Sequence, residues 1–171
     1  LNYMVKNSIR IFKYILIIII FYSFSGYAQP GLPQRSITLY AAQALDFGKF
    51  YDEGSGGSIT VDWRGIRSST GSIYGTISSL VSPAIFEIKL CQGRAITISY
   101  PQTSTLTGKR NGGSIILNIG PTEKGGNGVT FATDQNCDFI TILRVGGTLN
   151  IPANTPVDDY TGSFEISFDQ Q

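Results

Sequence analysis

The sequence has 171 residues, with 13 Lys and Arg against 12 Asp and Glu, and it contains no histidine. The absence of histidine excludes Ser-His-Asp and Cys-His catalysis, His-ligated metals and a His-based pH switch. The near-neutral charge excludes the basic excess that is typical of nucleic-acid-binding proteins.

Residues 1–28 predict a secretory signal peptide. Three basic residues precede an apolar run at 15–21, and the small-x-small triplet Gly-Tyr-Ala ends at Ala28. The run is shorter than the roughly 20 residues that span a membrane. We therefore expect cleavage near Ala28, release to the periplasm or cell surface, and contact with the membrane only through the signal peptide. Cleavage would leave 10 Lys and Arg against 12 Asp and Glu, a net charge of −2.

The two cysteines, Cys91 and Cys137, are interpreted as a structural disulfide. Oxidation is the usual state of paired cysteines in secreted proteins. In the chain-entropy model such a bridge would stabilise the fold by about 4 kcal/mol. Two reduced, buried thiols are the alternative.

After a proline-containing leader at 29–35, the sequence predicts short strands between Gly-, Ser-, Asn- or Pro-rich turns. The predicted strands are 36–40, 44–51, 58–63, 73–77, 83–90, 95–100, 113–119, 129–132, 139–145, 148–151 and 160–168. A turn is expected at 53–57 and a hairpin loop at 121–128. No helical periodicity follows Ala28, so we predict one antiparallel β-sandwich domain over 36–171.

Three features refine this prediction. Gly48 is expected to mark a bulge, and Gly146-Gly147 a bulge or tight corner where side chains must be absent. The last strand alternates, with Tyr160, Phe164 and other apolar residues on one face, so we expect it to close its own domain. If a strand is exchanged between molecules, 36–40 is the better candidate because it is short and follows the leader.

Two residue groups have the composition of possible binding or catalytic sites. The stretch KGGNG at 124–128 lacks the order of a phosphate loop and is interpreted as a turn. Asp158 and Asp159 are adjacent on an extended chain and would point opposite ways, which disfavours shared catalysis. A calcium site would need several more oxygen ligands, for which 134–138 is the only other acidic cluster. We therefore assign no catalytic, cofactor-binding or metal-binding residue and expect no cofactor.

Aromatic residues leave two further hypotheses. Trp63, Tyr74 and Tyr100 could form a platform for sugar, although Trp63 shares a face with apolar neighbours and is expected in the core. Tyr160 near the start of a late strand is expected to form a tyrosine corner, in which the hydroxyl bonds to nearby backbone.

Read in order, several segments resemble a known family. They are LDFGKF at 45–50, GGSITVD at 56–62, GSIYG at 71–75, PAIFEIKL at 83–90, AITISYP at 95–101, VGGTLNIP at 145–152 and YTGSFEISF at 160–168. Together they resemble the secreted bacterial family known as domain of unknown function 4402. The most specific positions are Phe47, Gly48, Gly146, Gly147, Thr148, Leu149, Tyr160 and Gly162, with Thr161 between the last two.

That family is similar, more distantly, to spore coat protein U and fimbrial subunits, which implies an immunoglobulin-like, pilin-like sandwich. Pro30 and Pro33 in the leader, and the ending Asp169-Gln170-Gln171, depart from the pattern of pilins that lend a strand to a neighbour. The resemblance implies a non-enzymatic cell-surface or periplasmic structural protein, pilin-like or adhesin-like. The alternative is a module that binds glycan or another surface polymer. The expected partners are identical or related surface subunits, or glycan, and no nucleic acid.

Overall fold

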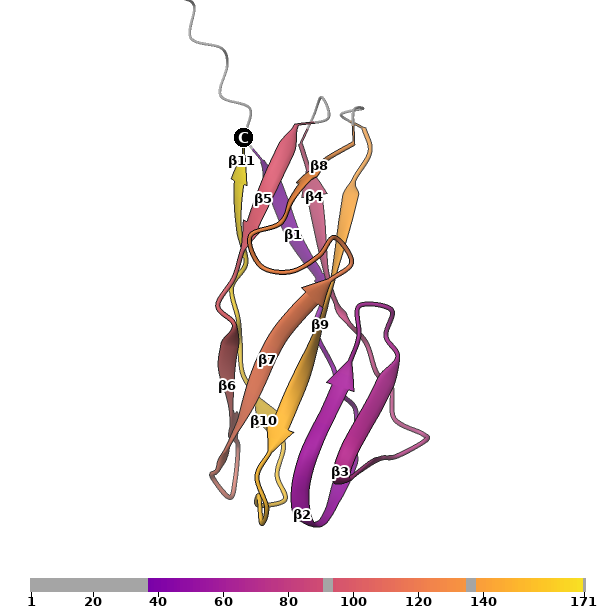
Figure 1. The fold of residues 1–171 in the computed structure, drawn as a ribbon, viewed down its shortest axis with the longest axis vertical. Coiled ribbons are helices and arrows are strands. Elements are labelled where there is room, and N and C mark those ends of the chain that lie inside the picture. The colour runs from indigo at the N-terminus through magenta and orange to yellow at the C-terminus, as the bar shows by residue number, and fades with distance from the viewer. Residues whose placement is uncertain (1–36, 91–93, 135–137, 171) are drawn as a thin grey trace, which may run out of the picture. The chain divides into compact units, whose positions relative to one another are not determined.

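The computed structural model describes residues 37–90, 94–134 and 138–170, and these residues are all-β (Figure 1). Their strands, in chain order, are β1 (Thr38–Gln43), β2 (Phe50–Val61), β3 (Arg67–Gly75), β4 (Ala84–Lys89), β5 (Ala95–Ser99), β6 (Thr103–Gly108), β7 (Ser114–Thr122), β8 (Thr130–Ala132), β9 (Thr141–Ile151), β10 (Tyr160–Thr161) and β11 (Ser167–Gln170). The prediction of an all-β domain is confirmed.

The strands form two antiparallel sheets. The larger sheet has eight strands in the order β1-β4-β9-β7-β6-β10, and the β2-β3 hairpin joins it alongside β9. The smaller sheet has three strands in the order β11-β5-β8. Every strand pairing is antiparallel, as predicted.

Both sheets contribute to one hydrophobic core. Ile59, Ile88 and Leu143 of the larger sheet and Ile96 and Ile98 of the smaller one are fully buried in the same cluster. Aromatic rings from the two sheets also contact each other, since the ring centroids of Phe86 in β4 and Phe168 in β11 are 6.2 Å apart. The alternation of apolar and polar residues predicted for 83–90 is confirmed, because Ala84, Phe86 and Ile88 pack on this core while Lys89 is exposed.

The glycine pair at 146–147 lies inside one continuous strand, so the predicted corner is wrong. Along one edge of β9 the partner changes there, from β4, which ends the pairing at Val145, to β2, which begins it at Gly147. The register shift lies on the opposite strand, β7, between Ile119 and Thr122. The expectation that side chains must be absent agrees with the structure, because a Cβ on Gly147 would lie 2.8 Å from Leu117 Cδ1.

The predicted strand 160–168 is divided in two, which corrects the sequence analysis. Tyr160 and Thr161 pair with β6 in the larger sheet, whereas Ser167–Gln170 pairs with β5 in the smaller one. The period of two survives because Phe164, Ile166 and Phe168 all pack on the core between the layers. The last strand therefore pairs within its own domain, as predicted.

Two glycine-rich segments that were predicted to be turns have other structures. The expected turn at 53–57 lies within β2, where the register with β3 shifts between Asp52 and Gly57. Asp52 organises this bulge by accepting hydrogen bonds from the Gly54 and Gly56 amides at 2.9 and 3.1 Å. The expected hairpin at 121–128 is not a hairpin, since β7 and β8 belong to different sheets.

Other strands also differ from the prediction, and the expected strand 73–77 is only the end of the longer β3. Of the expected strand 44–51, only an isolated bridge at Asp46 and the first residues of β2 are formed. Gly48 lies between them, outside the described strands, so the predicted bulge at Gly48 is wrong. The first strand is shifted to Thr38–Gln43, where Leu39 is 42% exposed at the sheet edge. β6 was not predicted at all, because its sequence TSTLTG carries a single large apolar residue.

Candidate functional site

The outer side of the larger sheet carries an ordered array of small polar side chains. It extends over β6, β7, β9, β2 and β3, which lie side by side in Figure 1. Strand register places its residues in two rows that cross these strands. The first row is Thr103, Asn118, Thr148, Thr60 and Ser68, and the second is Thr105, Ile116, Asn150, Ser58 and Thr70. We call these ten residues the polar face.

The polar face points away from the core because its neighbours along each strand point inward. Ile59, Leu117 and Leu149, which alternate with its members, are at most 5% exposed. Its members are exposed or half-buried, and none of them carries a charge. An uncharged surface of this breadth can offer hydroxyl and amide groups as hydrogen-bond donors and acceptors at once.

Hydroxyl pairs order part of the polar face. Thr60 Oγ1 and Thr148 Oγ1 are 2.8 Å apart, and Ser58 Oγ and Thr70 Oγ1 are also 2.8 Å apart. Within the described parts of the chain, the side-chain amides of Asn118 and Asn150 have no protein hydrogen-bond partner. These two amides are therefore open to a ligand.

A hollow of about 320 Å³ lies at one end of the polar face. Its lining includes Ser114, Ile116, Asn150 and Pro152. Ile116 is 50% exposed and is the apolar member of the array. The hollow thus combines an apolar contact surface with an amide and a hydroxyl.

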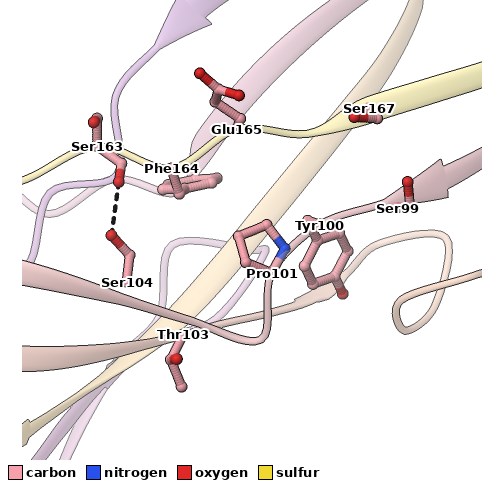
Figure 2. A pocket seen from close by; sticks show the side chains of 9 residues that line it. All are labelled: Ser99, Tyr100, Pro101, Thr103, Ser104, Ser163, Phe164, Glu165 and Ser167. Carbon is pink, nitrogen blue, oxygen red and sulfur yellow. Dashed lines mark hydrogen bonds between the residues drawn. The ribbon is translucent and has the colours of Figure 1, made fainter.

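A second, larger hollow of about 550 Å³ lies at the seam between the two sheets (Figure 2). It opens because β10 ends at Thr161, after which the chain leaves β6 for the smaller sheet. Its lining residues are Ser99, Tyr100, Pro101, Thr103, Ser104, Ser163, Phe164, Glu165 and Ser167. The Ser104 hydroxyl bridges the seam by donating to the Ser163 carbonyl at 2.6 Å.

Two aromatic residues that line the seam hollow, Phe164 and Tyr100, also pack on the hydrophobic core. Phe164 contacts Phe86 edge to face, with ring centroids 6.3 Å apart. Tyr100 is 7% exposed, and its burial raises the pKa of its hydroxyl. Both rings therefore pack in the core, which leaves the serine hydroxyls, the Thr103 hydroxyl and the Glu165 carboxylate as the polar side-chain groups of this hollow.

The structure does not assemble the predicted aromatic platform. Tyr100 is in the core. Trp63 is not part of the core cluster, contrary to the prediction, because it lies half-buried in the turn after β2, with the Arg64 guanidinium 4.5 Å from its ring centroid. Tyr74 instead stacks on Tyr51, its partner across the β2-β3 pair, with centroids 5.5 Å apart. Tyr51 was not predicted as part of an aromatic site because only strand register places it beside Tyr74.

Asp158 and Asp159 stabilise the local structure through hydrogen bonds and an ion pair. Asp158 Oδ2 accepts hydrogen bonds from the amides of Arg110 and Asn111, both at 2.7 Å, and Asp159 pairs with the Arg110 guanidinium at 3.2 Å. Desolvation raises the pKa of Asp158, but the amides of Asn111, Arg110 and Asp159, together with the Arg110 charge, lower it overall. The pair thus fastens the β6-β7 turn to the segment before β10.

Tyr160 makes the backbone contact expected of a tyrosine corner. Its hydroxyl donates to the Pro156 carbonyl at 2.6 Å. Desolvation, followed by the nearby Asp158 charge, raises the pKa of this hydroxyl. The contact holds the chain as it enters β10.

The other residues singled out by sequence also have structural positions. Phe47 and Leu149 are buried in the core. Gly48 has φ of 70°, which favours glycine, and a Cβ on Gly162 would lie 2.8 Å from the Thr105 carbonyl oxygen. Thr148 is the one member of this set that also belongs to the polar face.

Cys91 and Cys137 lie outside the described residues, so their pairing stays a prediction. Residues that flank the two cysteines in sequence are in contact with one another. The Thr133 hydroxyl donates to the carbonyl oxygens of Leu90 and Arg94, at 3.1 Å in each case.

Residues 124–128 form part of the connection between β7 and β8. Within the described ranges, no three Cys, Asp or Glu side chains gather in a way that could hold a metal ion. The same ranges contain no helix long and apolar enough to cross a membrane.

The fold defines a two-sheet, antiparallel all-β domain whose larger sheet carries the uncharged polar face on its outer side. The family model described as Domain of unknown function (DUF4402) matches residues 37–169, and the chain belongs to this family. Searches of curated proteins and of solved structures found no match.

Proposed function

We propose that the protein is a secreted, non-enzymatic structural protein of the cell surface or periplasm, of the adhesin-like kind. The observation that carries the proposal is the polar face. It presents ten aligned, uncharged positions on five strands, which suits contact over an area, whereas single-point chemistry uses a concave pocket with convergent polar groups. The predicted signal peptide supplies the route out of the cytoplasm.

The continuous strand pairing of the larger sheet supports the same proposal. β9 lies between β4 or β2 on one edge and β7 on the other, so the strands beneath the polar face are mutually bonded. The resemblance to spore coat protein U and fimbrial subunits, with their immunoglobulin-like sandwiches, belongs to this proposal as well. The last strand pairs with β5, so the subunit has no need of a partner's strand at this edge.

Labelling of intact cells tests the location. An epitope inserted after Ser78, in the exposed loop between β3 and β4, should leave the sheets undisturbed. We expect an antibody that cannot cross membranes to label intact cells, or to label them once the outer barrier is opened. Recovery of the tagged protein only from the cytoplasm, with residues 1–28 still attached, would contradict the proposal.

Deletion of the gene tests the role. Cells that lack the protein should adhere less well to a surface or to one another, and the full chain should restore adhesion. Unchanged adhesion and an unchanged cell envelope in the deletion strain would argue against a structural role.

A further inference from the structure

We infer that the polar face binds a single, extended, uncharged glycan chain that runs across the strands. This inference deepens the proposed function and rests on it, because it names the ligand class and the surface that an adhesin-like protein would use. The residues that carry it are the two rows of the polar face and the hollow that contains Ile116 and Asn150.

The chemistry of the polar face matches that of a neutral sugar chain. Sugar hydroxyl groups both donate and accept hydrogen bonds, and Thr, Ser and Asn side chains do the same. Asn118 and Asn150, which lie in adjacent rows, have amides without a protein partner among the described residues. Ile116 and Pro152 at the hollow can contact the apolar face of a sugar ring.

The absence of charge on the polar face favours a neutral ligand over an acidic one. No member of the polar face is ionisable, and the nearest charge along β9, on Arg144, is paired with Glu123 at 2.9 Å. An acidic polysaccharide or nucleic acid would find no unpaired cation within the array, and its desolvated charges would be costly. A neutral chain incurs no such cost.

The geometry of the rows gives the direction and the length of the glycan segment that the polar face would bind. Neighbouring strands are about 4.8 Å apart, so a row that crosses five strands offers a polar group at regular steps over about 19 Å. Adjacent strands also rotate by about 20°, which accumulates to about 80° across the row. A flexible single chain can follow this twist, whereas the planar surface of a crystalline polymer cannot.

The test measures binding of the full chain to defined polysaccharides by isothermal titration calorimetry. The neutral probes are dextran, a mixed-linkage β-glucan, glucomannan and galactan. Polygalacturonate is the acidic probe, and microcrystalline cellulose, assayed by sedimentation, is the planar one. We expect at least one neutral soluble chain to bind, with affinity that rises with oligosaccharide length up to about 19 Å and then levels off.

Three lysine substitutions and one conservative substitution locate the site. Thr105→Lys and Asn150→Lys place a long, charged side chain on the second row and should weaken binding about tenfold or more, equivalent to about 1.4 kcal/mol. Thr130→Lys is the control at an exposed strand position of the smaller sheet, where it removes the hydroxyl that pairs with Thr97 Oγ1 at 2.7 Å, and it should leave affinity within about twofold because it lies outside the polar face. Thr105→Val keeps the side-chain shape, removes the hydroxyl and should weaken binding without unfolding the sheet.

The outcomes separate the two proposals. Equal loss of binding in all three lysine variants, or preference for polygalacturonate or crystalline cellulose, overturns the inference. Binding to none of the neutral chains by a protein that labels at the cell surface and supports adhesion also overturns it, and leaves the proposed function standing.

Discussion

The carbonyl oxygen of Val61 lies 2.6 Å from the position that a Cβ atom on Gly146 would occupy. This close approach occurs where the edge partner of β9 changes from β4 to β2. The glycine thus allows two strands to meet on one edge of the central strand.

Gly146→Ala should therefore destabilise the domain by about 1–3 kcal/mol, because a buried backbone must move to admit the methyl group. Chemical denaturation measures the change. Gly126→Ala is the matched control, since a Cβ there would meet nothing within 4 Å, and it should change stability by less than about 0.5 kcal/mol. Equal stability of the two variants would mean that the contact at Gly146 is easily relieved.

Phe164→Asp should destabilise the protein by more than about 3 kcal/mol, because it removes a ring from the core and places a charge against Phe86. Glu165→Lys, one residue further along, changes an exposed side chain and should be tolerated. Thermal melting of both variants compares the two faces of the segment. The opposite ranking would show that the assignment of faces is wrong.

Tyr160→Phe should cost about 1 kcal/mol, the typical net contribution of one hydrogen bond, because it removes only the donor to the Pro156 carbonyl. Tyr40→Phe serves as the control, since Tyr40 is 64% exposed and its hydroxyl has no partner among the described residues. Urea titration should resolve the difference. If the two variants were equally stable, the hydrogen bond of the tyrosine corner would have no stabilising role.

Asp158→Asn should destabilise the protein at neutral pH, and the difference from wild type should shrink in acid. The folded-state pKa of Asp158 is below its usual value of 3.8, so its contribution is present above that value and is lost as the pH falls through the lower, folded-state pKa. Melting temperatures measured from about pH 7 to about pH 2 test this. A constant difference over that range would contradict the assigned role.

A disulfide between Cys91 and Cys137 should appear in peptide mass mapping of the non-reduced protein. Its reduction should lower stability by about 4 kcal/mol, by analogy with other loop-closing bridges. The Thr133 bonds to Leu90 and Arg94 bring the flanking segments together, which supports the pairing. Detection of two free thiols in the secreted protein would contradict it.

Much of the fold could be predicted because it depends on local patterns. Alternation at 83–90 identifies the core face of β4, and the glycine pair at 146–147 identifies a position without room for side chains. Tyr160 at the start of a late strand predicted its contact with upstream backbone. These features are encoded within a few residues of the chain.

Tertiary structure decided the pairing of strands and hence the candidate site. Thr103 and Ser68 belong to one row only because β6, β7, β9, β2 and β3 are adjacent in that order and in that register. The same pairing separates Tyr160 from Phe168 into two sheets, although both residues follow one alternating pattern. Periodicity specifies which face of a strand is buried, whereas hydrogen bonds between segments far apart in sequence specify what lies beside it.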